Sequence, residues 1–142
     1  MNNPVIGTVD LSTLSHESAA SIVSAALQVA ESTYSGAVAC AVTGAQGELI
    51  AYGAADGTGT LPRRLAIRKA YSAVLFKRDT TAVREAVSSG KIDMVRLADA
   101  ELIAIPGGEP ILVDGRIVGG VGVSGLTPDE DAEVARAALS KR

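Results

Sequence analysis

The fold is decided by the stretch ILVDGRIVGGVGV at residues 111–123, in which two apolar runs flank an Asp-Gly pair. Asp114-Gly115 suits the tight turn whose backbone twist matches that of two paired strands. The stretch therefore predicts an antiparallel hairpin with strands over 111–113 and 116–123. Its glycines are not a dinucleotide-binding loop, because they lie inside a strand and no helix opens on them. They predict close packing against a helix or a second subunit.

The residues that precede this hairpin predict helices and one further hairpin. Residues 37–43 and 48–52 are apolar runs around the turn Gly44–Gly47 and predict the second hairpin. Ser15 is a predicted cap for a helix that runs to about residues 32–35. A strong helix is expected over 61–77, and another from Asp79 or Thr80 to about Ser88. The spacing of the apolar residues in 92–104 is ambiguous between a helix and a strand, and we expect a strand there.

The C-terminal part carries a strong helix start. Thr127 suits the cap position, Pro128 the first helical position, and Glu130 completes a capping box. Strands joined as hairpins, rather than strands alternating with helices, favour an antiparallel sheet with helices packed on it. With no linker and no obvious repeat, residues 1–142 are predicted to form a single α+β domain.

Composition excludes several classes of function. The 142 residues contain one cysteine and one histidine, which excludes an internal disulfide framework, a cysteine-based zinc site and a histidine cluster, so no metal site is expected. The net charge of −3 offers no general nucleic-acid footprint. No apolar run approaches the length of a membrane span, and no basic stretch followed by an apolar run opens the chain, so we expect a cytoplasmic protein.

The basic residues are concentrated in one predicted helix. Six of the thirteen lie within residues 63–78, where no acidic residue occurs. Arg64 and Arg68 are spaced so that they repel on a helix unless a partner neutralises them. One interpretation is a solvated face paired with acids elsewhere. The other is a pocket for a carboxylate-bearing small molecule, since arginine binds carboxylates with two parallel hydrogen bonds. The candidate ligand-binding side chains of this helix are Arg64, Arg68, Lys69 and Arg78.

A second group of candidates surrounds the Gly-Gly pair before the hairpin. Gly107 and Gly108 are expected either to present backbone N–H groups to an anion or to form a turn that needs positive φ. Glu109 is the candidate acid/base, because a partly buried carboxyl group has a raised pKa; the alternative is a surface glutamate paired with an arginine. Ser124 ends the second strand and either donates to a ligand or closes a turn.

These residues resemble a known family. Pro106-Gly107-Gly108-Glu109-Pro110-Ile111, the stretch 114–125 and Asp131 look like the C-terminal signature of the GlcG/HbpS/PduO-C-terminal-domain family, and Asp56-Gly57 with the helix around Lys69 fits it as well. The resemblance spans about residues 15–140. It implies a profilin-like α/β/α domain with a five-stranded antiparallel sheet, assembly into homodimers or larger oligomers, and haem or a corrinoid as possible cofactors.

Three hypotheses of function follow. The first is a small oligomeric module that binds an anionic small molecule or a tetrapyrrole. The second is a cofactor-free isomerase, tautomerase or lyase that acts on a small carboxylate, with Glu109 as acid/base. The third is a non-catalytic accessory subunit. For a haem iron the sequence offers His16, Tyr52 or Tyr71 as ligands, although each also suits a structural role.

Overall fold

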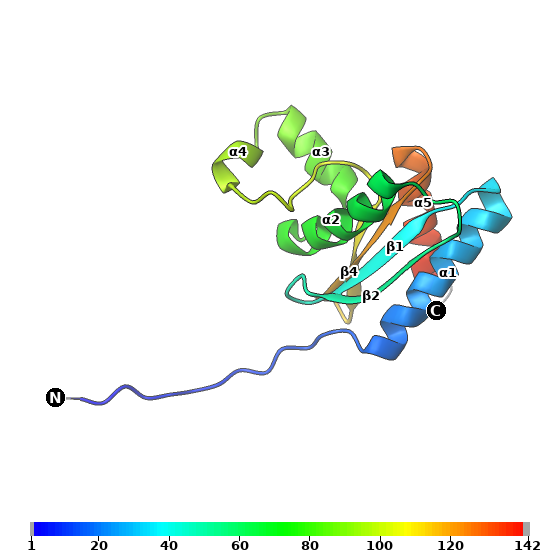
Figure 1. Ribbon diagram of the computed structural model, residues 1–142. Coiled ribbons are helices and arrows are strands. Elements are labelled where there is room, and N and C mark those ends of the chain that lie inside the picture. The colour runs from blue at the N-terminus through cyan, green and yellow to red at the C-terminus, as the bar shows by residue number, and fades with distance from the viewer. Residues whose placement is uncertain (1, 141–142) are drawn as a thin grey trace.

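A computed structural model describes residues 2–140, and these form one antiparallel sheet with helices on both faces (Figure 1). The strands are β1 (Ala39–Gly44), β2 (Leu49–Ala54), β3 (Gly108–Val113) and β4 (Arg116–Ser124). Their order in the sheet is β2-β1-β4-β3. Both predicted hairpins are confirmed, but the expected five-stranded sheet is wrong for the described residues, which contribute four strands.

Five helices accompany the sheet in residues 2–140. They are α1 (His16–Tyr34), α2 (Thr60–Phe76), α3 (Thr80–Ser88), α4 (Met94–Leu97) and α5 (Pro128–Ser140). α1 and α5 pack against each other on one face of the sheet, and α2 packs on the other face against β1, β3 and β4. The helices and sheet thus build the α/β/α layers that the family resemblance implied.

The strand expected over 92–104 is also wrong. This segment contains the short helix α4, in which the Asp93 carboxylate accepts hydrogen bonds from the N–H groups of Val95 and Arg96. It then continues as a loop along α2, where Ile103 N–H donates to Ser72 Oγ at 2.8 Å. The charged residues between the apolar ones suit a solvated surface segment and leave no continuous apolar face to bury in a sheet.

The local signals at helix starts are confirmed. Ser15 Oγ accepts from Ser18 N–H and Asp79 Oδ1 accepts from Ala82 N–H. Thr127 and Glu130 form the predicted reciprocal box, in which each side chain accepts from the other residue's backbone N–H. Such caps satisfy backbone donors that the helix itself leaves unpaired.

The core is built from small side chains, as the composition suggests. Between the sheet and helices α1 and α5 lies a cluster rich in valine and alanine, and between the sheet and α2 lies a smaller, alanine-based cluster. The second layer is thin because β4 presents glycines to α2. A Cβ on Gly122 would lie 2.0 Å from the carbonyl oxygen of Ala66, and one on Gly120 would lie 2.5 Å from that of Ala70. None of the described helices is long and apolar enough to cross a lipid bilayer.

Candidate functional site

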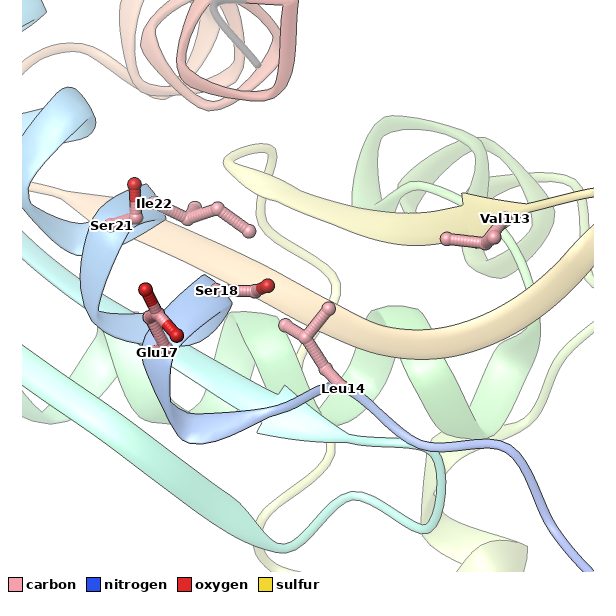
Figure 2. A pocket seen from close by; sticks show the side chains of 6 residues that line it. All are labelled: Leu14, Glu17, Ser18, Ser21, Ile22 and Val113. Atoms are coloured by element: carbon pink, nitrogen blue, oxygen red, sulfur yellow. The ribbon is translucent and has the colours of Figure 1, made fainter.

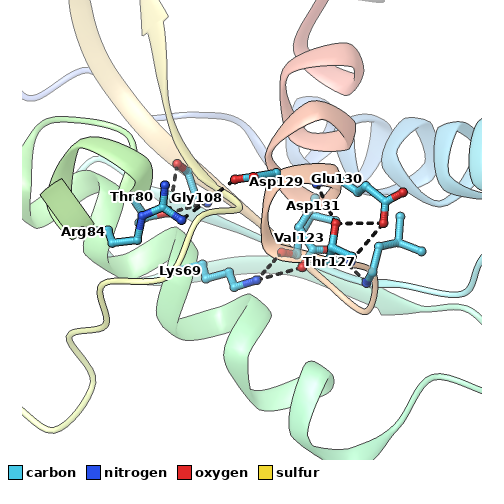
Figure 3. Close-up of polar contacts among 10 residues, drawn as sticks. Lys69, Thr80, Arg84, Gly108, Val123, Thr127, Asp129, Glu130 and Asp131 are labelled. Atoms are coloured by element: carbon cyan, nitrogen blue, oxygen red, sulfur yellow. Dashed lines mark hydrogen bonds and ion pairs between the residues drawn. The ribbon is translucent and has the colours of Figure 1, made fainter.

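Lys69 is the basic residue of α2 that points inward. Its side chain is 1% exposed, and its Nζ donates to Asp131 Oδ2 and to the carbonyl oxygen of Val123, both at 3.0 Å (Figure 3). Asp131 belongs to α5 and also accepts from Leu126 N–H at 2.9 Å. Burial lowers the pKa of Lys69 and raises the pKa of Asp131, and the attraction between the two charges opposes both shifts. This ion pair joins α2 to α5 beside the end of β4.

The two glycines of the 106–110 segment pack directly on Lys69. Gly107 has φ +126°, and a Cβ there would lie 2.9 Å from Lys69 Nζ and 2.5 Å from the Val123 carbonyl oxygen. Gly108 N–H donates to Thr80 Oγ1 at 2.8 Å (Figure 3). An anion that used this N–H group would have to displace Thr80. The segment also enters the sheet earlier than predicted, since β3 begins at Gly108 and not at 111.

Four predicted site residues therefore meet at the end of β4. Ser124 is 3% exposed and follows Val123, whose carbonyl oxygen accepts from Lys69. Ser124 lies opposite Ala39 of β1. The structure thus brings together Lys69, Gly107, Gly108 and Ser124, but as a packed cluster in which Lys69 already has a carboxylate partner.

Glu109 lies one residue further along β3. Its side chain is 12% exposed, and Arg136 Nη1 of α5 donates to its Oε1 at 3.0 Å. Burial raises the pKa of Glu109, the negative charge of Asp79 raises it further, and Arg136 opposes both effects. Glu109 thus combines the raised pKa of one interpretation with the arginine partner of the other, and its role as acid/base stays a prediction.

The arginine beside Glu109 comes from α5 and not from α2. Arg136 was not predicted as a site residue, because the basic residues are concentrated in the helix predicted over 63–78. The signal available was modest: Arg136 is the single basic residue between Pro128 and Ser140, in a helix whose other face is apolar. Its side chain is 56% exposed, so its outer side faces solvent.

The remaining arginine candidates lie on the surface, Arg64 and Arg68 on α2 and Arg78 just after the end of that helix. Arg68 Nε is 3.6 Å from Glu101 Oε2, and Arg78 Nε donates to the carbonyl oxygen of Phe76. Arg64 is exposed and has no carboxylate within 4.0 Å among residues 2–140. Leu61 is 64% exposed and lies one turn before Arg64. This outer face, made of Leu61, Arg64 and Arg68, is separate from the Lys69 cluster.

A hollow of about 360 Å³ opens elsewhere, between the start of α1 and the end of β3 (Figure 2). The side chains that line it are Leu14, Glu17, Ser18, Ser21, Ile22 and Val113. None of the predicted site residues is among them. The hollow is thus a feature that sequence reasoning did not identify.

The predicted iron-ligand candidates differ in availability. His16 is exposed at the start of α1, and Tyr52 is 39% exposed on β2. Tyr71 is already engaged, since its hydroxyl donates to Asp99 Oδ2 at 2.6 Å. Cys40 is buried, and burial raises the pKa of its thiol to about 12. The described residues contain no cluster of three or more His, Cys, Asp or Glu side chains able to hold a metal ion.

Comparison with known proteins decides the family. A family model described as "Haem degrading protein HbpS-like" matches residues 14–140. The chain belongs to the HbpS-like family. The protein GlcG of Escherichia coli K12 is 36% identical over 111 residues, which cover 78% of this chain and 81% of GlcG. The resemblance stated from the C-terminal signature is therefore confirmed.

Solved structures of HbpS-like proteins share the fold. A double mutant of HbpS from Streptomyces reticuli superposes with a TM-score of 0.86 at 25% identity, covering 99% of this chain and 97% of HbpS. The structure of a PduOC–haem complex superposes with a TM-score of 0.84 at 23% identity, covering 92% of this chain and 95% of PduOC. The α+β architecture of this chain is therefore that of the HbpS-like proteins.

Proposed function

We propose that this chain binds haem or a related tetrapyrrole that carries carboxylate groups. The observation that carries the proposal is the match of residues 14–140 to a haem-degrading family, together with the haem complex of a protein with the same fold. The outer face of α2 supplies chemistry that suits such a ligand, because it combines exposed apolar surface at Leu61 with the cations Arg64 and Arg68.

Different residues of this chain suit the propionate groups of haem and its iron. Its propionates suit Arg64, which has no carboxylate partner within residues 2–140, and Arg68, whose contact with the half-exposed Glu101 is long at 3.6 Å. Its iron could be held by Tyr52, which is exposed on β2, but less readily by Tyr71, whose hydroxyl already donates to Asp99. His16 is exposed as well, but it starts α1 on the face of the sheet opposite α2. Bound haem supplies redox and oxygen chemistry at its iron.

Titration of the full haem-free chain with haemin tests this proposal. We expect a Soret shift that saturates with haemin. We also expect Arg64→Ala and Arg68→Ala each to weaken binding by about 10- to 100-fold, the loss typical of a hydrogen bond to a charged group. His16→Ala should change the Soret position if His16 holds the iron, and Tyr52→Phe should do so if Tyr52 does.

Arg96→Ala provides a matched control. Arg96 is an exposed arginine outside α2 that contacts Asp93 at 3.4 Å, so its loss should leave haemin affinity unchanged. Absence of any saturable Soret change would contradict haem binding. Equal affinity of wild type, Arg64→Ala and Arg68→Ala would place the ligand away from the outer face of α2.

A second function is favoured by Glu109. A buried carboxyl group with a raised pKa, next to a half-exposed arginine, is suited to move a proton on a small carboxylate whose own charge Arg136 would hold. Such a cofactor-free isomerase, tautomerase or lyase requires a Glu109 that is still protonated above the usual range of a carboxyl group. The pH dependence of unfolding measures that directly.

A further inference from the structure

A loop of the chain covers part of the basic helix. α2 carries Leu61, Arg64 and Arg68 in one stripe, since residues three and four positions apart on a helix lie on the same side. Tyr71 and Ser72 continue this stripe toward the C-terminal end of α2. The loop that follows α4 runs along that end of the helix (Figure 1). The stripe therefore has an open N-terminal half and a covered C-terminal half.

Two hydrogen bonds fix this loop on α2. Tyr71 Oη donates to Asp99 Oδ2 at 2.6 Å, and Ile103 N–H donates to Oγ of the buried Ser72 at 2.8 Å. The other carboxylate oxygen of Asp99 accepts from Glu101 N–H at 2.9 Å. Asp99 thus joins the loop to the helix and also sets the position of Glu101, which lies between the two anchored residues.

The side chain of Glu101 meets Arg68 at the boundary between the two halves of the stripe. Glu101 Oε2 lies 3.6 Å from Arg68 Nε, which is longer than the about 2.7–3.2 Å of an N–H···O hydrogen bond. The side chains of Arg68 and Glu101 are 35% and 57% exposed, so water screens their attraction. An ion pair with this length and exposure contributes little, and another carboxylate can replace Glu101 at small cost.

We propose that Glu101 is a built-in competitor for Arg68, which a carboxylate of the ligand displaces on binding. The inference rests on the proposed binding of a carboxylate-bearing tetrapyrrole at the outer face of α2. Glu101 Oε2 faces the same guanidinium group that a propionate of this ligand requires. Arg64 has no such competitor, because no carboxylate of residues 2–140 lies within 4.0 Å of it.

Such a competitor decides which ligands can use Arg68. Glu101 is tethered by its loop, so it is present beside Arg68 at a high effective concentration, and a free monocarboxylate in dilute solution does not displace it. A ligand whose first carboxylate is held by Arg64 brings its second one to Arg68 as a tethered group too, because the two arginines are neighbours on the helix. Glu101 therefore favours ligands that carry two neighbouring carboxylates.

Haemin titration of Glu101→Gln in the full chain tests the competitor. Glutamine keeps the size of the side chain and the backbone bond to Asp99 but loses the charge, so Arg68 becomes free for a propionate. We expect the haemin affinity to rise by about 2- to 5-fold, which corresponds to the loss of an exposed ion pair. In an Arg68→Ala background the same substitution should change nothing, because the group for which Glu101 competes is gone.

Two matched controls separate this effect from net charge and from haem contacts in general. Asp129 is an exposed acid that also lies near an arginine, Arg84, at 3.9 Å, so Asp129→Asn removes the same charge and should leave the haemin affinity unchanged. Haemin dimethyl ester keeps the iron and the ring but has no carboxylate. Its affinity should be the same for wild type and for Glu101→Gln.

The outcomes distinguish the competitor from the proposed function. Saturable binding of haemin to wild type without a gain in Glu101→Gln overturns the competitor and leaves haem binding intact. An equal gain in the Arg68→Ala background, or with the dimethyl ester, also overturns it, because the effect then does not pass through Arg68 and a carboxylate. A Soret change in Glu101→Gln but not in wild type supports the competitor. No saturable Soret change in any variant overturns both.

Discussion

Glu109 shows how one carboxyl group can be held between opposing influences. Its burial and the nearby Asp79 favour the neutral form, while Arg136 favours the charged form, and the balance raises the pKa of Glu109 above its ordinary value of 4.5. Sequence alone suggested the raised pKa from a glutamate beside two glycines. The identity of the arginine could not be read from sequence, because residues 109 and 136 meet only through the packing of α5 on the sheet.

Glu109→Gln should reveal this balance in the pH dependence of unfolding. A group whose folded pKa is raised binds more protons in the folded state, so its favourable contribution is full below pH 4.5 and is lost as pH rises through the folded pKa. Wild type should therefore lose stability relative to Glu109→Gln over that window. Urea unfolding of both proteins between about pH 3.5 and about pH 7.5 measures the difference.

Two further variants sharpen the Glu109 prediction. Arg136→Met removes the charge that opposes the shift, so the loss of stability should extend to higher pH. Glu85→Gln removes the same charge as Glu109→Gln from an exposed position and is the matched control. If wild type instead gains stability relative to Glu109→Gln as pH rises, the attraction of Arg136 outweighs the effects of burial and Asp79 on the pKa of Glu109. That result would count against Glu109 as a proton carrier.

Among the elements, the contact between α2 and β4 depends on glycines where the helix backbone meets the strand. The atoms nearest to a Cβ on Gly122 are the carbonyl oxygen of Ala66 and the backbone nitrogen of Ala70, at 2.0 and 2.5 Å. Backbone atoms cannot rotate away as the end of a side chain can. The glycines of this strand predict close packing against a helix or a second subunit, and the structure confirms it with α2 as the packing partner.

Gly122→Ala should consequently move the helix layer off the sheet. We expect a loss of about 3 kcal/mol or more in the free energy of unfolding, at the upper end of what overpacking usually costs. Gly7→Ala is the matched control, because no atom lies within 4 Å of its added Cβ. Urea unfolding of both variants checks the prediction, and equal stability would show that α2 can shift without cost.

Helices and strands were predicted correctly where the sequence signal is local, and the predictions were wrong where it is not. The caps at Ser15, Asp79 and Thr127 involve residues within three positions of each other, so short sequence patterns specify them. The segment 92–104 was misread because its apolar residues have no period, and its path is set by contacts with α2 such as Ile103 with Ser72. β3 was predicted too short because Pro110 suggests a loop, although proline is tolerated on an edge strand.

In the whole molecule, the Lys69–Asp131 pair joins the layers on the two faces of the sheet. Lys69 comes from α2 and Asp131 from α5, 62 positions apart in the chain, and both side chains are at most 2% exposed. Lys69 was predicted as a ligand-binding residue from the charge of its helix. That role stays a prediction, and its placement shows that one side chain of a basic helix can turn inward when an acid from another element neutralises it.

Breaking this pair on one side should destabilise the protein strongly. Lys69→Met leaves Asp131 buried without its cation and Asp131→Asn leaves Lys69 without its anion, so each should lower the free energy of unfolding by about 3–5 kcal/mol. The double variant removes both charges and should cost less than the sum of the single variants. Asparagine keeps an oxygen that can accept from Leu126 N–H. This double-mutant cycle therefore measures the effect of removing the two charges and leaves that hydrogen bond in place.

The exposed pair of Arg84 and Asp129 supplies the comparison for this cycle. Their closest charged atoms are 3.9 Å apart and their side chains are 45% and 83% exposed, so the coupling energy of Arg84→Ala with Asp129→Ala should be about 0–1 kcal/mol. A Lys69–Asp131 coupling no larger than this would mean that water reaches the buried pair. A large coupling would instead show that the two helix layers are held together by a desolvated ion pair, which ties the packing around Gly107 to the docking of α5.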